Sequence, residues 1–284
     1  MASSRNIVSP ASVTQWWWTF GYFIDANTVF HGFVRYPFGR VTIIDAPGAG
    51  AIPGTGQGTV AESINIEGTI AGQYQDANLV FHCFLGYPDG HIITFDAPDA
   101  GTGQRQGSLA YGINLEGTIA GITIDDKNVL HGFVRSPLGT FTSFEAPDAG
   151  TAPGLGTTVT LESGLNSQGT IIGWSIYAAN AAHGYLRKSN GTFILFDPQG
   201  SVLTFPGAIN SDGLIVRGAA DANFVLHGFV RSVNGAITTF DIPGAGSTPG
   251  TFQGTLALGV SSFGLSTGYW VDSNNIAHGF IRLP

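Results

Sequence analysis

The sequence predicts an all-β protein: a six-bladed β-propeller with four antiparallel strands per blade, in which an N-terminal strand closes the last blade. Three observations support this. A phrase that begins with histidine recurs six times, at intervals of 44 to 52 residues. The phrases between the histidines are short, rich in β-branched and aromatic residues, and bounded by Gly, Pro, Asn or Asp, which is typical of strands. No segment shows a convincing 3.6-residue period, so we expect almost no helix.

Each repeat contains four phrases in a fixed order, and one copy illustrates them all. GTVAESIN (58–65) ends in Asn, GTIAGQYQD (68–76) follows, VFHCFLG (80–86) carries the histidine, and IITFDAPDAG (92–101) carries Asp and Pro. The segment Asn65–Gly68 predicts a tight hairpin, because Asn bonds to its own backbone and Gly adopts positive φ. Pro88–Gly90 predicts the next hairpin. Four antiparallel strands in about 50 residues are typical of one propeller blade.

The repeats place six blades in a single domain that covers residues 1–284. The approximate blades are 11–46, 58–97, 107–146, 156–197, 201–241 and 253–284. The last repeat ends after its histidine phrase, and NIVSPAS (6–12) resembles the missing Asp-Pro phrase. We therefore expect residues 5–10 to supply the fourth strand of the last blade, which removes the free edge of an open ring. The Asn phrase is then the innermost strand of each blade and the Asp-Pro phrase the outermost.

Composition excludes several classes of function. The net charge is −8 with only 11 Lys and Arg residues, which argues against nucleic acid and anionic membranes as partners. No apolar stretch approaches the roughly 20 residues of a membrane-spanning helix. The single cysteine, Cys83, excludes an intramolecular disulfide and is expected to be buried and inert. We expect a monomer that binds a small molecule or a glycan.

The repeat also resembles a known family. The run GIN-x-x-GTIAG, then HGFVR, then a phrase that ends in T-x-F-D, is similar to the bacterial extracellular HAF-repeat proteins over residues ~15–284. The resemblance is specific for the repeat motif, and it implies no catalytic residues. It implies a secreted, extracellular or cell-surface location, whereas Met1–Pro10 lacks the features of a signal peptide.

The six histidines favour a structural role over a metal site. They are His31, His82, His131, His183, His227 and His278. Metal ligands must converge to within ~2–2.6 Å of one point, and one third-strand histidine per blade cannot do so. We expect each imidazole to be buried and to tie its strand to an Asp, a hydroxyl or a backbone group. The recurring arginine that ends this phrase is expected to pack or pair at the blade surface, with an acidic-ligand site as the rival interpretation.

The Asn set on the innermost strands allows a weak metal hypothesis. Its members are Asn65, Asn114, Asn166 and Asn210. Inner strands converge on the propeller axis, where Asn and Glu oxygens suit Ca²⁺. Hairpin geometry explains the same residues without a metal, so we expect no cofactor and keep calcium in the central channel as the alternative.

Residues that break the repeat are the candidates for a specific site. Glu62 and Glu162 are the candidate catalytic carboxylates if the protein is an enzyme. The candidate ligand-binding residues are Tyr111, Trp18, Trp174, Trp270 and Arg217. Tryptophans combined with carboxylates and Arg are typical of sugar and aromatic-ligand sites, although large aromatics also fill space between propeller sheets.

Two functions follow from these residues. The first is an extracellular-type binding module for a carbohydrate or another small ligand, favoured by regular blades and by the lack of a nucleophile motif. The second is a propeller hydrolase or lyase that acts at the channel mouth through Glu62 and Glu162, with or without calcium. Whether the protein is an enzyme stays open at this point.

Overall fold

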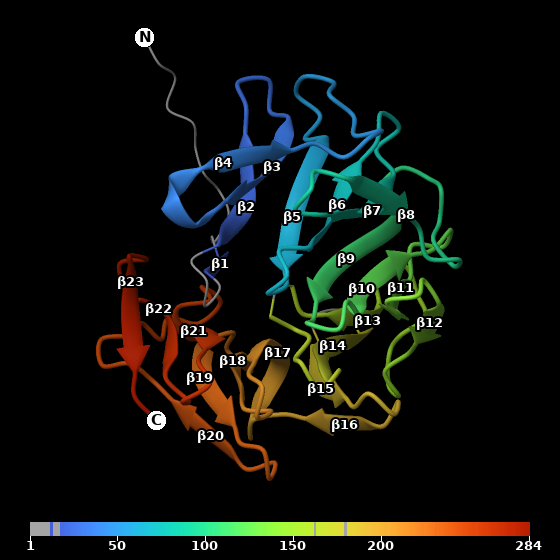
Figure 1. Ribbon diagram of the computed structural model, residues 1–284. Coiled ribbons are helices and arrows are strands. Elements are labelled where there is room, and N and C mark those ends of the chain that lie inside the picture. The colour runs from blue at the N-terminus through green and yellow to red at the C-terminus, as the bar shows by residue number, and fades with distance from the viewer. Residues whose placement is uncertain (1–11, 14–17, 162, 179–180) are drawn as a thin grey trace. The chain divides into compact units, whose positions relative to one another are not determined.

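The computed structural model describes residues 12–13, 18–161, 163–178 and 181–284, and these residues form antiparallel strands (Figure 1). Within these ranges there is no α-helix, and the one helical element is a short 3-10 turn, η1 (Pro37–Gly39). The all-β prediction is therefore confirmed. Residues 5–10, the predicted closing strand, lie outside the described residues.

The strands follow the four predicted phrases, and we number the repeats in chain order. Repeat 1 contains β1 (Ser12–Val13), β2 (Thr19–Ile24), β3 (Phe30–Arg35) and β4 (Val41–Ile44). Repeat 2 contains β5 (Gly58–Ile64), β6 (Ile70–Gln75), β7 (Phe81–Gly86) and β8 (Ile92–Phe95). Repeat 3 contains β9 (Gly107–Ile113), β10 (Ile119–Ile124), β11 (Leu130–Arg135) and β12 (Phe141–Phe144).

The second half continues the same pattern. Repeat 4 contains β13 (Gly156–Val159), β14 (Ile171–Ala178), β15 (Ala181–Arg187) and β16 (Phe193–Phe196). Repeat 5 contains β17 (Ser201–Ile209), β18 (Ile215–Asp221), β19 (Leu226–Arg231) and β20 (Ile237–Phe240). Repeat 6 contains β21 (Gly254–Val260), β22 (Ser266–Val271) and β23 (Ala277–Arg282). Within each repeat every strand pairs antiparallel with the next in the chain.

The contacts divide the chain into two compact units. The first extends to Phe144 and includes Ala152–Gly154, and the second holds Glu145–Thr151 and Leu155–Pro284. Repeats 1–3 therefore lie in the first unit and repeats 4–6 in the second. The prediction of a single domain over residues 1–284 stays a prediction.

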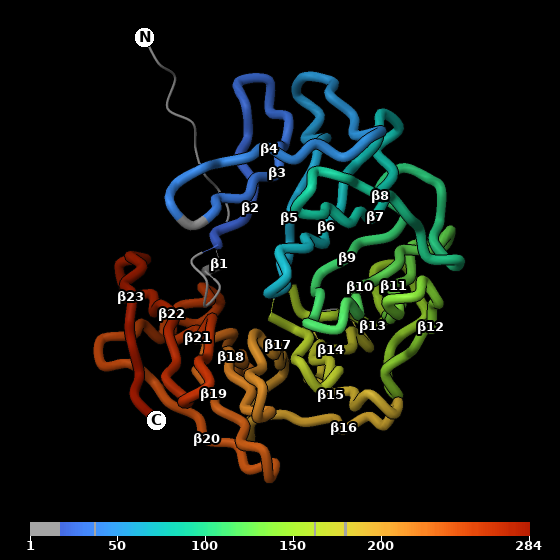
Figure 2. Tube along the Cα trace, viewed as in Figure 1, coloured from blue at the N-terminus to red at the C-terminus, as the bar shows by residue number. Residues whose placement is uncertain are grey.

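Within a unit, consecutive repeats are tied together where one repeat leads into the next (Figure 2). A parallel bridge joins the third strand of one repeat to the first strand of the next, as at Phe30 and Gly58 in the first unit and Leu226 and Gly254 in the second. The Ala46 amide donates to the Thr59 hydroxyl over 2.9 Å and so fixes the start of β5 against the end of repeat 1.

The hydrophobic core lies between neighbouring repeats of a unit. One cluster joins Phe20 and Ile44 of repeat 1 to Ile70 and Phe84 of repeat 2, and another joins Ile172 of repeat 4 to Phe229 of repeat 5. A lone four-stranded sheet exposes two apolar faces, so each repeat depends on its neighbour for burial. Phe84, Phe133 and Phe229 have no exposed surface, and each contributes about 1.5–3 kcal/mol of burial.

Strand glycines make this packing close. Gly121 on β10 faces Phe133 on β11 in register, and a Cβ on Gly121 would lie 2.7 Å from the Phe133 ring and 2.1 Å from the Leu109 carbonyl oxygen. Gly72 with Phe84 and Gly173 with Tyr185 repeat this arrangement. The second glycine of the GTIAG phrase therefore lets the aromatic ring of the third strand lie directly against the backbone of the second strand.

A glycine on the third strand contacts an aromatic ring on the fourth strand in the same way. Gly132, in the HGF phrase, faces Phe144 in register, and a Cβ there would lie 2.2 Å from the Phe144 ring. Gly228 faces Phe240 in the same way. In repeat 2 this position is Cys83, which has no exposed surface, as the sequence predicts. Burial raises the pKa of the Cys83 thiol, which keeps it protonated and unreactive.

We expect Gly132→Ala to lower stability by about 1–3 kcal/mol, because the added methyl group must displace the Phe144 ring. Gly279→Ala is the matched control: it has the same place in its HGF phrase, but the nearest atom of the described residues to its Cβ is 4.0 Å away. Chemical denaturation of both variants measures the difference. Equal losses in the two variants would contradict the proposed role of the ring contact.

Candidate functional site

The recurring histidines join two loops of their own repeat. His31 Nδ1 lies 2.8 Å from Asp45, and its Nε2 lies 3.8 Å from Asp25. His82 with Asp96 and Asp76, and His227 with Asp241 and Asp221, repeat this geometry. The predicted structural role is supported, but the predicted burial is wrong: the His31 side chain is 25% exposed and that of His227 36%. The histidines lie at the surface because their Asp partners belong to turns.

Four histidines also stack on an aromatic side chain of the second strand. The ring centroids of Tyr74 and His82 are 5.0 Å apart, and those of Trp270 and His278 are 4.2 Å apart. Phe23 on His31 and Tyr177 on His183 complete the set. The candidate ligand-binding residue Trp270 therefore makes an internal stacking contact.

Three of the recurring arginines lie over aromatic rings of the preceding repeat. Arg135 lies 4.6 Å from the Phe95 ring centroid, Arg231 5.0 Å from that of Phe196, and Arg282 4.9 Å from that of Phe240. The one repeat that lacks the arginine has Gly86, and there the facing residue is Ile44 instead of an aromatic. The arginine and the ring change together, which supports a packing role.

The asparagines of the first hairpin are engaged by the backbone. Asn65 Oδ1 accepts from the Glu67 and Thr69 amides over 3.1 and 2.9 Å. Its Nδ2 donates to the Asn114 carbonyl over 3.4 Å, and Asn166 and Asn210 bond to the next repeat of their unit likewise. These bonds account for the asparagines as turn and inter-repeat contacts. In the described ranges no group of three or more His, Cys, Asp or Glu side chains is arranged so that it could hold a metal ion, and calcium stays an untested alternative.

The other candidate ligand residues also make packing contacts. Trp18 lies 4.9 Å from Tyr36, and Trp174 meets Phe205 edge-on with centroids 5.5 Å apart. Arg217 occupies the place that the second-strand glycine has in other repeats, and its side chain passes so close to Gly207 that a Cβ there would lie 2.2 Å from its Cδ. Whether these residues also bind a ligand stays a prediction.

Glu62 and Tyr111 are brought into one neighbourhood. Each lies at a β-bulge in a first strand of the same unit, Glu62 on β5 and Tyr111 on β9. Burial raises the pKa of the Tyr111 hydroxyl, and the Glu62 carboxylate adds to this rise. Gln73 Nε2 donates to Glu62 Oε1 over 3.1 Å. Glu162, the second predicted carboxylate, lies outside the described residues.

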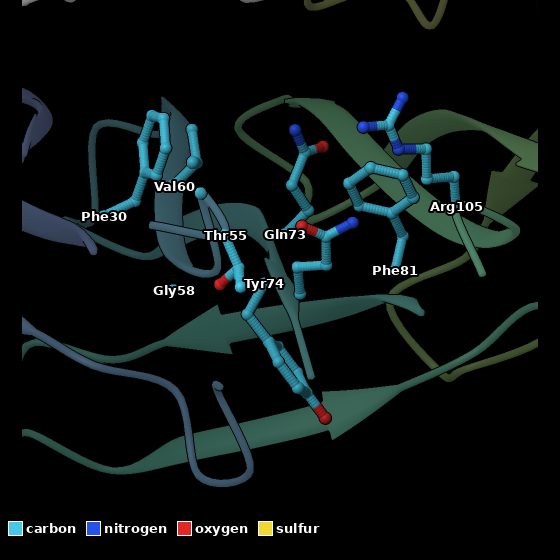
Figure 3. A pocket seen from close by; sticks show the side chains of 10 residues that line it. Phe30, Thr55, Gly58, Val60, Gln73, Tyr74, Phe81 and Arg105 are labelled. Carbon is cyan, nitrogen blue, oxygen red and sulfur yellow. The ribbon is translucent and has the colours of Figure 1, made fainter. Parts of the chain in front are cut away.

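Beside this network, between repeats 1 and 2, is a groove of about 430 Å³, which we call the repeat 2 groove. The residues that line it include Phe30, Thr55, Gln73, Gln75, Phe81 and Arg105. Figure 3 shows the Gln73 side chain between the Phe30 and Phe81 rings in this view, with Arg105 beside Phe81. Gln73 Oε1 is buried and has no hydrogen-bond partner among the residues that the structure describes, so its acceptor capacity is unused.

Glu62 stands out in the sequence as a break in the repeat, whereas Gln73, Gln75, Phe30 and Phe81 were not predicted as site residues. A signal was present in the second-strand phrases: GTIAGQYQD has two glutamines where GTIAGITID has Ile122 and Ile124. Phe30 and Phe81 read as ordinary strand residues, because the first residue of the histidine strand is apolar in most repeats. Only the juxtaposition of two repeats shows that these rings border one groove.

Comparisons with known proteins bear on the fold. No protein-family model matches the chain, and no curated protein matches it. A triple arginine-to-alanine mutant of AofleA from Arthrobotrys oligospora is 12% identical, with 96% of this chain and 81% of that chain covered and a TM-score of 0.53. The likeness to AofleA shows a shared fold alone, and the resemblance to HAF-repeat proteins stays a prediction.

Two structures of the lectin of Aleuria aurantia are also similar. One, a mutant in complex with alpha-methyl-L-fucoside, is 14% identical, with 93% and 86% of the two chains covered and a TM-score of 0.43. The other, described as a six-bladed β-propeller with a novel fucose recognition mode, is 13% identical, with 93% and 86% covered and a TM-score of 0.40.

Over the described residues, no helix is long and apolar enough to cross a membrane.

The turn aspartates predict an acid-sensitive stability. Asp25, Asp221 and Asp272 each accept backbone N–H bonds, first from Val29, Val225 and Ile276, and these bonds hold the pKa of each carboxyl below its usual value. The stabilisation is complete above the unfolded pKa of about 4 and is lost as pH falls through the lower folded values. We expect the melting temperature to drop below about pH 4. Asp221→Asn should make this drop shallower.

Melting curves between acid and neutral pH measure this effect. Asp126→Asn is the control, since Asp126 is exposed and its side chain is not part of such a turn. Identical acid profiles for both variants and the parent would count against the turn aspartates as the source.

Proposed function

We propose that this chain is a glycan-binding module whose binding site is the repeat 2 groove. The observation that carries the proposal is the pairing of two aromatic rings, Phe30 and Phe81, with the amide groups of Gln73 and Gln75 in one groove of about 430 Å³. A sugar ring has an apolar face that stacks on an aromatic ring and hydroxyls that bond to amides. Grooves of this size that combine aromatic rings with a few polar groups are typical small-molecule sites.

Each polar group has a defined part in this proposal. Glu62 accepts from Gln73 Nε2 and so orients the amide, while Gln73 Oε1 accepts a hydrogen bond from a sugar hydroxyl. Gln75 is held by its own bond to the Leu79 carbonyl over 3.1 Å. Among the described residues that line the groove, Arg105 alone carries a charge. Its guanidinium donates to hydroxyls or to an acidic sugar, so neutral and anionic glycans are favoured over cationic ones.

The proposal implies one principal site per chain. The two glutamines are replaced by Ile122 and Ile124 in repeat 3 and by Tyr269 and Val271 in repeat 6. A groove with the same chemistry therefore does not recur in every repeat. This sets the proposal apart from equivalent sites in all grooves and from a hydrolase that depends on Glu62 and Glu162.

We expect native protein to bind a glycan from a broad panel with a stoichiometry near one. Phe81→Ala should weaken binding about twofold to tenfold, since a stacked ring contributes about 0.5–1.5 kcal/mol. Gln73→Leu should weaken it as well. Phe263→Ala is the control, because that ring is 88% exposed and does not line the groove. Calorimetric titration against the best glycan measures both quantities.

Other outcomes would redirect the proposal. Four to six equivalent sites unaffected by Phe81→Ala would indicate a repeated-groove module. Product formation that disappears in both Glu62→Gln and Glu162→Gln would indicate the hydrolase or lyase. Either result would remove the repeat 2 groove as the principal binding site.

We also propose that the six repeats form a six-bladed propeller in which residues 5–10 complete repeat 6. In the part of the chain that the structure describes, β23 pairs with β22 alone. Ile281 on β23 is 70% exposed, whereas Val34 and Leu85, which have the same place in β3 and β7, are 2% and 4% exposed. An exposed apolar edge favours pairing with a further strand.

Deletion of residues 1–10 should therefore lower the melting temperature and promote aggregation through the free β23 edge. Differential scanning calorimetry and light scattering measure the two effects. Deletion of Met1–Ser3 alone is the control and should leave both unchanged. A melting curve that is unaffected by the longer deletion would rule out this closure.

A further inference from the structure

Repeats 2 and 6 each contain a slot that is filled by one of their own aromatic rings. In repeat 2, Tyr74 pairs in register with His82, and its ring lies beneath Gly48 of the turn that follows β4; a Cβ on Gly48 would lie 3.6 Å from the ring. In repeat 6, Trp270 pairs with His278 and lies beneath Gly244, whose Cβ would be 3.0 Å from the ring. The ring is thus held between a histidine and a turn glycine.

Repeat 5 has the same frame without the ring. Ala219 pairs in register with His227, where Tyr74 and Trp270 pair with theirs. Gly200 follows Asp197 by three residues, as Gly48 follows Asp45, yet no atom of the described residues would lie within 4 Å of a Cβ on Gly200. A cavity of about 230 Å³ is present at this place. We call it the repeat 5 slot, and its lining includes Pro198, Gly200, Ser201, Ala219, His227 and Thr239.

Repeat 4 shows a third way to occupy the position. Ser175 pairs with His183, and its hydroxyl donates to Asp148 Oδ1 over 2.7 Å. A polar pair thus occupies this position, and the ring that stacks on His183 belongs to Tyr177, two residues further along β14. The repeat 5 slot has neither the ring nor this pair, because Ala219 is too short and Gly200 has no side chain.

The polar groups around the slot match those around Tyr74. The Tyr74 hydroxyl bonds to the Thr94 side chain, two residues before Asp96. Thr239 stands two residues before Asp241 and lines the repeat 5 slot. His227 is held by Asp241, whose carboxylate oxygens lie 3.0 and 3.1 Å from Nδ1. A ring in the slot therefore meets an oriented imidazole on its face and a threonine hydroxyl at its edge.

Charge restricts the ring to a neutral one. Burial raises the pKa of Tyr74, and Asp96 and Asp76 add to the rise, while its bond to Thr94 opposes it. Asp241 and Asp221 have the same places beside the repeat 5 slot. Two carboxylates disfavour a phenolate and leave a neutral phenol as the species that fits.

We propose that the repeat 5 slot binds a neutral phenol ring, stacked on His227 and hydrogen-bonded to Thr239, in the position that Tyr74 occupies in repeat 2. The slot lies in the second unit and shares no residue with the repeat 2 groove, so the two sites are independent. The ligand is a small phenolic compound or a tyrosine side chain, since both present the same ring and hydroxyl.

The test uses p-cresol, which is the side chain of tyrosine, on the full chain. We expect saturable binding of one equivalent, a rise in melting temperature, and shifts of the His227 ring signals in NMR spectra. Ala219→Tyr should fill the slot from within, raise the melting temperature without ligand, and abolish the His227 shifts. Absence of His227 shifts in the native protein, or full p-cresol binding by Ala219→Tyr, would overturn the proposal.

Two further variants keep the test decisive if Ala219→Tyr folds poorly. Thr239→Val should weaken p-cresol binding about fivefold, the value of one hydrogen bond, and leave toluene binding unchanged. Thr238→Val is its control, because Thr238 is exposed and does not line the slot. Tyr74→Ala should open the matching slot in repeat 2 and bind a second equivalent of p-cresol. Equal effects of the two threonine variants, or no second equivalent in Tyr74→Ala, would also overturn the proposal.

Discussion

The close approach of an aromatic ring to a strand glycine is the contact on which the repeats depend. A ring such as Phe133 can lie on the backbone of β10 only because Gly121 has no Cβ, and the same holds for Phe144 over Gly132. These contacts let neighbouring repeats bury their sheet faces against each other, which no single four-stranded sheet achieves alone. Repeat 5, which lacks the second-strand glycine, is consistent with this requirement for space. Where Arg217 replaces the second-strand glycine, Gly207 on the facing strand supplies the missing space.

Polar contacts at the strand ends hold this frame and leave one position free to vary. The aspartate turns, the histidine contacts and the hairpin asparagines bond mainly within their own repeat or to the adjacent one. Residues in the middle of the second strand are not part of these recurring polar contacts. There Gln73 borders a groove, Tyr74 and Trp270 fill slots, and Ala219 leaves one empty. Specific chemistry arises where a regular frame meets an irregular residue, which is the expectation for a repeat protein.

The arginines show why recurrence by itself is a poor guide to a ligand site. Arg135, Arg231 and Arg282 each meet an aromatic ring of the preceding repeat, and burial lowers the pKa of Arg231. A cation that is already stacked and largely buried offers less to an acidic ligand than an exposed one. Arg105 is different, since it occurs once and lines a groove. The rival interpretation of the recurring arginines as a set of acidic-ligand sites therefore has less support than their role in packing.

The sequence by itself determined the strands, their order and their turns, because each depends on local patterns: β-branched and aromatic runs, Asn and Gly at hairpins, and a phrase repeated in register. It also predicted Asp as a partner of the histidines and Cys83 as a buried residue. Only the tertiary structure decided which side chains share a site. The exposure of the histidines, the pairing of Glu62 with Gln73, the Phe30 and Phe81 groove and the empty space beside Ala219 all depend on residues that are distant in the chain. A sequence pattern records what each residue is, whereas the volume left between two packed repeats depends on how their side chains meet across the interface.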